Sequence, residues 1–459
     1  MSPFKFCDIR GVYPEEVNEN LAHKLGRAVA ALAEPGAVAV AGDLRPSTQS
    51  LKDALIAGLL AGGRRVLDMG SLPTPAYYFE KARLGVTPGV MVTGSHNPPK
   101  YNGFKPQLGR FPISQADLTR LEILSARRWE PSGAGACVRV GGPDAYAKAL
   151  SDRFRGMAPI RVAVDAGNGS LWELAPKVFR AVGCDVIEVY CEPDGTFPNR
   201  APNPADPENL RAVSEAVRSR SVELGVAFDG DGDRVAFLTS DGKVVEPDQM
   251  LAVVASELLR ESPGRAVIHD LKSSRVVPAV VQAAGGVALW ERSGHTSMKS
   301  RMIRERALFG GEVSGHFFFE ELAGGDDGLF AALLVASLLP RWGGLRKRLD
   351  SLPRYVTLPE IRLPYPEGRK QVIDTIRAGL DGEADLTLTD GVRADWPECW
   401  GIVRASVTEP VLALRFEGTS EQALLEGAQR FLVLLPEPAR AEAEGRLKRL
   451  LEERRVRGS

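Results

Sequence analysis

AVAVAGDLRPS, residues 37–47, is the first of three stretches in which a short apolar segment ends in an aspartate and a small polar loop. The second is RVAVDAGNGS at 161–170, and the third is AVIHDLKSS at 266–274. Short continuous apolar strands that alternate with helix-like segments are typical of parallel sheets covered on both faces. The three aspartates are roughly one domain length apart. The pattern therefore predicts three related α/β units.

Loop-rich stretches indicate where these units end. PSGAGA at 131–136 separates the first two units, and the turn SDG at 240–242 closes the second. The proline-rich stretch 353–366 indicates a linker to a smaller unit of a different kind. The predicted domains are 1–142, 143–247, 248–358 and 359–459.

The bulk properties exclude several classes of protein. A chain of 459 residues is too long for one core, and a net charge of −1 gives no electrostatic footprint for nucleic acid. The start of the chain lacks the apolar segment of a secretory signal, and the apolar run 329–339 is too short to span a bilayer. The five cysteines are widely spaced and lack metal-type pairs. We expect a cytoplasmic, multidomain α/β protein that binds neither nucleic acid nor a membrane.

The hexapeptide DGDGDR at 229–234 carries the clearest chemical signal. Asp229, Asp231 and Asp233 alternate with glycine, and glycine permits the tight loop that turns three carboxylates onto one cation. Oxygen ligands alone select Mg²⁺ or Ca²⁺, although a solvated acidic turn is an alternative. An EF-hand loop requires glycine sixth and glutamate twelfth, and this sequence has neither. Arg234, directly after the aspartates, suggests an anion such as phosphate beside the metal.

The loop TGSHNPP at 93–99 follows an apolar strand and offers a candidate nucleophile. Ser95, held in a loop made rigid by glycine and proline, can accept a phosphoryl group. An ordinary structured turn is the alternative. His96 is not expected to be its base, because adjacent side chains diverge in extended chain. Lys105, in YNGFK shortly afterwards, can return to the same site.

Two further histidines lie in loops rich in glycine and serine. These are His295 in RSGHTSMK and His316 in GEVSGH. Such loops contribute little to a core, so these histidines suggest chemistry, although a lone histidine is more often a packing or capping residue. The alternation Glu312, Ser314, His316 predicts three polar groups on one side of an extended segment, which suits sugar hydroxyls.

The segment RASVTEP at 404–410 lies in the last predicted unit. Arg404, Ser406 and Thr408 combine a guanidinium with two hydroxyls within one turn, which matches the acceptor pattern of a phosphate. By itself the segment is equally consistent with a surface turn.

These motifs together resemble the α-D-phosphohexomutase family, and specifically its bacterial phosphomannomutase/phosphoglucomutase branch. The resemblance covers essentially the whole chain, because DIRG at 8–11, TGSHNPP, DGDGDR, GEVSGH and RASVTEP occur in the family's order. It implies three related α/β domains with mixed, mostly parallel sheets and a smaller α+β C-terminal domain, arranged around a central cleft. In chain order the domains would carry the phosphoserine loop, the metal, the sugar contacts and a distal phosphate site.

The resemblance also implies a mechanism. Ser95 would carry a phosphoryl group, and as phosphoserine it would complete the coordination of Mg²⁺ by the three aspartates. The group would pass to a hexose monophosphate to give a bound 1,6-bisphosphate, which also serves as activator. This intermediate would then reverse its orientation in the site, and Ser95 would recover a phosphoryl group from its other end. The remaining roles would be proton transfer by Lys105 and His295, contact with the transferring group by Arg10 and Arg234, sugar contacts by Glu312, Ser314, His316 and Lys272, and the distal phosphate clamp of Arg404, Ser406 and Thr408.

Two residues depart from the family pattern, since Cys7 stands where tyrosine is common and Val407 where asparagine or glycine is common. The expected partners are hexose phosphates of mannose or glucose, and the expected assembly is a monomer or a weak homo-oligomer. The alternatives are a phosphoglucosamine mutase, a catalytically inactive sugar-phosphate binding protein and a metal-dependent serine phosphatase. TGSHNPP and YNGFK favour the mannose/glucose branch, and the retained Ser95, aspartates and Lys105 argue against an inactive protein.

Overall fold

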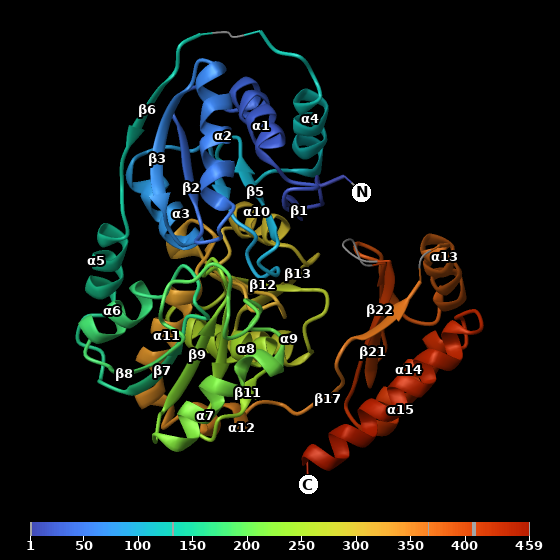
Figure 1. Cartoon of the computed structure of the whole chain (residues 1–459). Coiled ribbons are helices and arrows are strands. Elements are labelled where there is room, and N and C mark those ends of the chain that lie inside the picture. The colour runs from blue at the N-terminus through green and yellow to red at the C-terminus, as the bar shows by residue number, and fades with distance from the viewer. Residues whose placement is uncertain (1, 131–132, 366, 406–409, 459) are drawn as a thin grey trace.

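A computed structural model describes residues 2–130, 133–365, 367–405 and 410–458 of the chain. Figure 1 shows four units: a blue N-terminal unit above, green and yellow units below it, and an orange-to-red C-terminal unit at one side. Each unit is built on its own sheet. The mixed α/β fold and the smaller last unit agree with the sequence prediction.

The first sheet has the order β1-β5-β4-β2-β3-β6, with parallel pairing from β4 to β6 and antiparallel pairing at β5 and β1. Its strands are β1 (Ile9–Val12), β2 (Val38–Gly42), β3 (Arg65–Ser71), β4 (Gly89–Val92), β5 (Tyr101–Gln107) and β6 (Ala136–Arg139). Its helices are α1 (Glu19–Leu32), α2 (Thr48–Ala61), α3 (Thr74–Arg83) and α4 (Gln115–Ser125). Every residue of β2 is buried, as expected for a strand covered on both faces.

The second sheet has the order β11-β10-β9-β7-β8. Its strands are β7 (Arg161–Asp165), β8 (Asp185–Val189), β9 (Leu224–Phe228), β10 (Val235–Leu238) and β11 (Val244–Val245). The helices around it are α5 (Asp144–Arg153), α6 (Leu174–Ala181), the 3₁₀ turn η1 (Pro207–Leu210) and α7 (Arg211–Ser219). The predicted turn at 240–242 joins the antiparallel strands β10 and β11.

The third sheet has the order β13-β12-β14-β15-β16. Its strands are β12 (Ala266–Asp270), β13 (Val287–Glu291), β14 (Phe309–Gly311), β15 (Phe317–Phe319) and β16 (Gly325–Asp326). The helical segments are α8 (Pro247–Glu261), α9 (Val276–Ala283), α10 (His295–Glu305), η2 (Glu320–Leu322), α11 (Gly328–Trp342) and α12 (Leu345–Asp350). Helix α11 contains the apolar run noted in the sequence, and most of its residues are buried.

The three α/β units repeat one topology. The strands β2, β7 and β12 each lie between two parallel neighbours, and each carries one of the three repeated sequence stretches. In every unit a helix leads from this central strand to one neighbour, while the other neighbour begins an antiparallel pair. The weak sequence repeat therefore marks a real structural repeat.

The fourth sheet is antiparallel throughout, with the order β17-β22-β21-β20-β19 and β18 also paired with β22. Its elements are β17 (Val356–Thr357), β18 (Ile361–Pro364), α13 (Arg369–Leu380), β19 (Asp385–Thr387), β20 (Val392–Asp395), β21 (Cys399–Ala405), β22 (Val411–Gly418), α14 (Glu421–Leu432) and α15 (Ala439–Gly458). The prediction of a plain linker at 353–366 was wrong in this respect, because β17 and β18 lie within it. Both strands are short and at the side of the sheet, where proline is tolerated.

One buried cluster extends through the first three units, which also have smaller clusters of their own, whereas the fourth unit has a separate core. Met69, Phe179 and Phe309 come from the first, second and third sheets or their helices and belong to the same buried cluster. The fourth unit buries a separate cluster and contacts the third through Leu271, Trp400 and Ile402. Within the described ranges, no helix combines the length and apolar character needed to cross a membrane.

Candidate active site

The loops that contain Ser95, Asp229 and Glu312 follow equivalent strands of the three α/β units. Strands β4, β9 and β14 are each parallel to the central strand of their sheet and antiparallel to the next one. Ser95 lies in the loop after β4, Asp229 directly after β9 and Glu312 directly after β14. The hydroxyl of Ser95 donates to Asp229 Oδ2 at 2.9 Å. The fold repeat thus supplies three equivalent loops, of which the first two meet at this hydrogen bond.

Ser95 adopts a left-handed backbone conformation that a network of main-chain hydrogen bonds maintains. Its φ is 47°, a region that is uncommon for residues other than glycine. The guanidinium of Arg45 donates to the carbonyls of Ser95, Asn97, Pro98 and Tyr101 at 2.8, 2.6, 2.7 and 2.9 Å. One buried side chain therefore fixes the shape of the whole loop.

Asp43 holds Arg45 and the start of the same loop. Its carboxylate accepts from Arg45 Nε at 3.2 Å, from Thr93 Oγ1 at 2.8 Å and from the main-chain amide of Gly94 at 3.2 Å. In the sequence, Asp43 and Arg45 are recognisable as parts of the repeat, but no residue pattern assigns them to the site. Their position directly after the central strand of the first sheet could have indicated that they belong to the site.

The expectation that Ser95 and His96 diverge was wrong. Ser95 Oγ lies 3.3 Å from His96 Nδ1. The expectation assumed an extended backbone, whereas the left-handed conformation at Ser95 turns the two side chains toward each other.

Asp229, Asp231 and Asp233 converge as the sequence predicted. One carboxylate oxygen from each lies within 4.8 Å of the others, and all three side chains are buried. Asp231 Oδ1 and Asp233 Oδ1 have no hydrogen-bond partner among the described residues. Gly230 has no room for a side chain, because a Cβ there would lie 2.5 Å from the Ser95 carbonyl.

Lys105 provides the positive charge nearest to this cluster. Its ammonium group donates to Asp231 Oδ2 at 2.7 Å and to Asp233 Oδ2 at 2.6 Å. Burial alone would lower the pKa of Lys105, but these two carboxylates raise it well above its ordinary value. Burial and the neighbouring Asp233 and Asp231 raise the pKa of Asp229. The two carboxylate oxygens of the cluster that lack a hydrogen bond to any described residue suit a divalent cation.

The segment 312–316 forms a tight turn instead of the predicted extended segment. The Glu312 amide donates to the His316 carbonyl at 3.0 Å, so the chain reverses between them. The three polar side chains still gather, because the Ser314 hydroxyl lies 2.9 Å from both Glu312 Oε2 and His316 Nδ1. The turn adjoins the hexapeptide 229–234, since the amide of Val235 donates to the carbonyl of Gly315 at 3.1 Å.

His316 faces several carboxylates. Its Nδ1 is 3.0 Å from Glu312 Oε2, and its Nε2 is 3.4 Å from Asp233 Oδ1. Burial and Arg234 act to lower the pKa of His316, but Asp233 and Glu312 raise it to about 10. The carboxylate of Asp326 lies 3.7 Å from His316 Nε2, and neither of its buried oxygens has a hydrogen-bond partner among the residues described.

A second group of possible ligands overlaps the first. Asp233, His316 and Asp326 also bring one ligand atom each within 4.8 Å of one another. However, Arg234 Nε is 3.3 Å from His316 Nε2, so a cation at that position would meet a positive charge. The three aspartates of the hexapeptide offer oxygen ligands only, which Mg²⁺ prefers, and they are the better site for that metal on this ground.

His295 begins α10 and lies close to His316. The two ring centroids are 6.3 Å apart. The preceding amide, of Gly294, donates to Glu312 Oε1, which ties this helix start to the 312–316 turn. Burial and the charge of Lys105 lower the pKa of His295 to about 3, so its ring is neutral near pH 7. Cys7 packs against this loop, and burial raises the pKa of its thiol to about 12.

The two predicted arginines lie on either side of the Ser95 loop. Arg10, on β1, donates to Asn97 Oδ1 at 2.7 Å and pairs with Asp8 at 2.5 Å. Arg234 Nε lies 3.9 Å from Asp229 Oδ2 and 4.0 Å from Asp233 Oδ1. Both charges therefore flank the serine and its aspartates.

The remaining predicted residues are not joined to this cluster by any described contact. Lys272 is half-buried in the loop after β12. Arg404 lies on β21 in the fourth unit, 3.5 Å from Glu360 and 3.9 Å from Asp390. Ser406 and Thr408 lie outside the described residues.

The chain is similar to known proteins along most of its length. The chain matches the phosphoglucomutase/phosphomannomutase alpha/beta/alpha domains I, II and III over residues 2–122, 144–242 and 246–355, and the C-terminal domain over 360–433. It is 38% identical to a phosphomannomutase/phosphoglucomutase of Pseudomonas aeruginosa, over 92% of this chain and 93% of that protein. It is 37% identical to a phosphoglucomutase of Neisseria gonorrhoeae, over 94% and 96% of the two chains.

A solved structure of a phosphoglucomutase/phosphomannomutase family protein from Burkholderia thailandensis is also similar. It has a TM-score of 0.88 and 37% identity, with 94% of this chain and 96% of that chain covered. A solved structure from Thermus thermophilus, at 24% identity and a TM-score of 0.79, shares the fold.

Proposed function

Because the chain belongs to the phosphoglucomutase/phosphomannomutase family and is a phosphohexomutase that interconverts hexose phosphates, we propose that it moves a phosphoryl group between the 1- and 6-hydroxyls of mannose or glucose. The proposed route passes through phosphorylated Ser95 and a bound hexose 1,6-bisphosphate. The same bisphosphate would act as activator by restoring the phosphoryl group to a dephosphorylated enzyme.

One observation carries this proposal. The Ser95 hydroxyl is 2.9 Å from Asp229 Oδ2, at the edge of a buried cluster in which two carboxylate oxygens have no hydrogen bond to any described residue. The residues fit Mg²⁺, which Asp229, Asp231, Asp233 and a phosphoryl oxygen on Ser95 would hold. When bound, Mg²⁺ withdraws charge from the phosphoryl group during transfer.

The charged residues around Ser95 would stabilise the transferring group. Lys105 stays protonated, because two carboxylates hold its ammonium, and it would balance the charge that develops at the reacting oxygen. Arg10 and Arg234 would contact the oxygens of the phosphoryl group from two sides. The neutral His295 ring would accept the proton of the attacking sugar hydroxyl.

The sugar and its second phosphate would bind further from Ser95. Glu312, Ser314 and His316 would contact sugar hydroxyls, with Lys272 nearby. Arg404, together with Ser406 and Thr408, would clamp the distal phosphate. Binding at the distal phosphate would position the reacting end, an effect worth up to ~7–11 kcal/mol in well-oriented systems.

The proposal extends to organisation and location. The first domain (1–142) would carry the phosphoserine, the second (143–247) the metal, the third (248–358) the sugar contacts and the fourth (359–459) the distal phosphate site. All five cysteines are free, which supports a reducing compartment such as the cytoplasm. The protein would act on small hexose phosphates as a monomer or a weak homo-oligomer.

Intact-mass analysis would test the phosphoserine. We expect an adduct of about 80 Da, one phosphoryl unit, that maps to Ser95 and disappears on phosphatase treatment. Ser95→Ala should abolish both the adduct and turnover while the protein stays folded. Ser125→Ala is a matched control, because this buried hydroxyl at the end of α4 has no partner among the described residues. Turnover in Ser95→Ala without an adduct would contradict the mechanism.

Substrate choice is tested by comparing mannose, glucose and glucosamine 1-phosphates with the phosphorylated enzyme. We expect the highest kcat/KM for mannose or glucose. A clear preference for glucosamine 1-phosphate would instead identify a phosphoglucosamine mutase with the same chemistry.

A further inference from the structure

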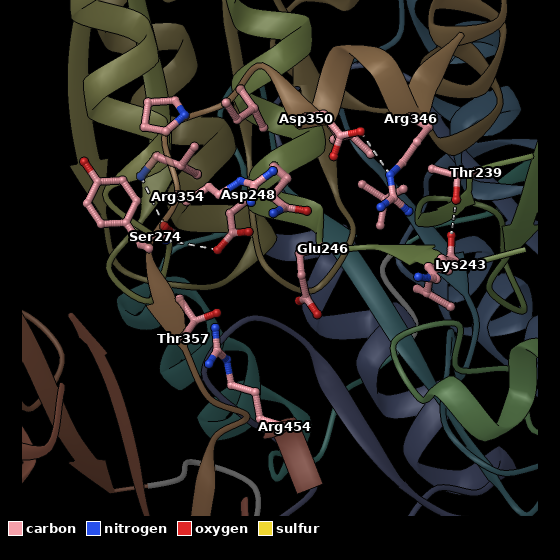
Figure 2. A pocket seen from close by; sticks show the side chains of 18 residues that line it. Thr239, Lys243, Glu246, Asp248, Ser274, Arg346, Asp350, Arg354, Thr357 and Arg454 are labelled. Carbon is pink, nitrogen blue, oxygen red and sulfur yellow. Dashed lines mark hydrogen bonds and ion pairs between the residues drawn. The ribbon is translucent and has the colours of Figure 1, made fainter. Parts of the chain in front are cut away.

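A cavity of about 410 Å³ lies where the second, third and fourth units meet, and it includes none of the residues assigned to the Ser95 site. Figure 2 shows its walls. They come from the β10–β11 hairpin (239–245), the start of α8, the start of α9 and the segment from α12 to β17 (346–357), with Arg454 of α15 at one side. The cavity therefore spans the connection between the third sheet and the C-terminal unit.

The walls of this cavity carry positive charge without local compensation. Lys243, Arg354 and Arg454 are exposed, and their charged groups have no ion pair or hydrogen bond to any described residue, although the charge of Arg454 acts on the carboxyl of Glu421. The Thr239 hydroxyl contacts Lys243 only at its main-chain carbonyl, to which it donates at 3.1 Å. Glu246 is an exposed wall carboxylate that is likewise free of ion pairs within the described part of the chain.

The other charged groups in the wall are already paired. Arg346 lies 3.1 Å from Asp241 and 3.2 Å from Asp350. Asp248 accepts from the amide of Ser274 at 3.0 Å and lies 3.4 Å from Arg415. Three free cations therefore face one free carboxylate, which leaves the cavity with an excess of positive charge that an anionic ligand would neutralise.

The size and the apolar part of the wall indicate what kind of anion fits. Small-molecule sites typically enclose roughly 300–1,000 Å³, so this cavity is large enough for more than a bare ion. Val276, Leu352 and Tyr355 supply an apolar surface, and the tyrosine ring can stack on a planar group. Guanidinium groups match the oxygens of a phosphate.

We propose that this cavity binds an organic phosphate of mononucleotide size. Its phosphate would lie against Arg354, Arg454 and Lys243, and its planar part against Tyr355. Glu246 would accept hydrogen bonds from hydroxyls of the ligand. The site takes a different ligand class from the hexose phosphates proposed for the Ser95 site, and binding there does not depend on catalysis.

Because the cavity lies between units, a bound ligand would affect how the C-terminal unit is oriented. Lys243 belongs to the second sheet's hairpin, while Arg454 belongs to the C-terminal unit. A ligand that contacts both would favour one orientation of the C-terminal unit, because it binds the other orientations less well. Inhibition of turnover follows from this only if that unit moves during catalysis, so the inhibitory part rests on the proposed function.

Calorimetric titration of AMP into the full-length protein tests the site directly. Mg²⁺ and saturating glucose 1,6-bisphosphate are present throughout, so that AMP does not report on the Ser95 site. We expect saturable one-to-one binding, with adenosine and inorganic phosphate each at least about tenfold weaker, since each lacks one recognised part. Absence of saturable binding up to roughly 10 mM AMP overturns the proposal.

Matched variants locate the binding. The double variant Arg354→Gln/Arg454→Gln should bind AMP at least about tenfold more weakly than the wild type. Arg377→Gln removes an exposed charge from α13 in the same C-terminal unit and should leave AMP affinity unchanged. Equal affinity in the double variant and the wild type, or equal loss in Arg377→Gln, overturns the assignment to this cavity.

Turnover measurements separate binding from regulation. AMP should inhibit the wild type without competing with the hexose phosphate, and the double variant should need more AMP for the same inhibition. AMP binding without inhibition would retain the site and reject the effect on the C-terminal unit. If Ser95 proved not to be phosphorylated, AMP binding would be unaffected, so the two proposals fail independently.

Discussion

Arg45 and Ser95 are joined by a hydrogen bond of 2.8 Å from the guanidinium to the serine's main-chain carbonyl, although they lie in the loops after two different strands of the first sheet. The same guanidinium donates to three more carbonyls of the Ser95 loop. It thereby stabilises a serine in the left-handed region, where its hydroxyl reaches Asp229. The reactivity assigned to Ser95 thus depends on a residue that does not belong to its own motif.

Arg45→Lys should lower kcat by about 100-fold, because an ammonium group cannot reach four carbonyls at once. Loss of these bonds should also cost ~1–3 kcal/mol in the free energy of unfolding. Arg64→Lys is the matched control, since Arg64 donates to carbonyls at the end of α1 (Ala30 at 2.8 Å, Glu34 at 3.0 Å), away from the site. The control should lose stability and keep its kcat. Unchanged turnover in Arg45→Lys would contradict this role for the loop.

Lys105→Met should bind a divalent cation about tenfold more tightly than the wild type while losing activity. The reason is that the ammonium group occupies the same carboxylates that would hold the metal. Addition of Mg²⁺ should therefore raise the melting temperature more in the variant. Lys52→Met, which breaks a different buried ion pair of 3.1 Å with Asp68, should show the wild-type response to Mg²⁺. Weaker Mg²⁺ binding in Lys105→Met would argue against a metal at these aspartates.

Gly230→Ala should separate the Ser95 loop from the hexapeptide 229–234. The added Cβ would lie 2.5 Å from the Ser95 carbonyl, which is main chain and cannot turn away. We expect at least about a tenfold loss of kcat and a destabilisation of ~1–3 kcal/mol in denaturant unfolding. Gly445→Ala, in the open on α15, should instead stabilise the protein by up to ~1 kcal/mol. Full activity in Gly230→Ala would show that the two loops need not touch.

Arg275→Ala should loosen the attachment of the C-terminal unit. The Arg275 side chain donates to the carbonyls of Pro397 and Cys399 at 2.9 and 3.0 Å and pairs with Asp395 at 3.3 Å. The C-terminal unit has a core of its own, so we expect calorimetry to show its unfolding as a separate, earlier transition.

The control for this variant is Arg260→Ala, which removes a partly exposed pair within α8 and should leave a single transition. A single transition in Arg275→Ala at the wild-type temperature would mean that the Leu271–Trp400–Ile402 contact suffices to hold the unit.

Asp327→Asn should change how stability depends on pH. Burial raises the pKa of Asp327 from 3.8 to about 7, even though the Phe330 amide and the Tyr146 hydroxyl donate to it. The folded protein therefore holds this proton more tightly than the unfolded chain does. Its contribution to stability is complete below the unfolded pKa and is lost as the pH rises through about 7.

Urea unfolding between about pH 4 and pH 8 would measure this effect. The wild type should lose stability relative to Asp327→Asn over that range by a few kcal/mol, since each unit of pKa shift is worth about 1.4 kcal/mol. Asp374→Asn, at an exposed position on α13, should follow the wild type at every pH. Parallel curves for Asp327→Asn and the wild type would contradict the raised pKa.

The sequence predicted the units better than it predicted their contacts. Apolar strands ending in Asp43, Asp165 and Asp270 indicated three α/β units, because strand periodicity and turn residues are local properties. The strands β17 and β18 were missed, since a short edge strand is set by its partner β22 rather than by its own residues. The turn at 312–316 was predicted as extended chain for the same reason: the chain reverses only in its tertiary setting.

The sequence alone specified the chemical groups: a loop serine, three carboxylates spaced by glycine, a lysine and three loop histidines. Which of these groups are in contact depends on how the loops are brought together in the folded protein. The Ser95 hydroxyl bonds to Asp229 because Arg45 fixes the serine loop, and His96 lies close to the same hydroxyl. Asp326 lies beside His316, but its carboxylate has no hydrogen bond to any described residue. The physical reason is that residue types and short spacings are encoded along the chain. Hydrogen bonds between loops, in contrast, depend on which strands pair and on the backbone conformation at single residues.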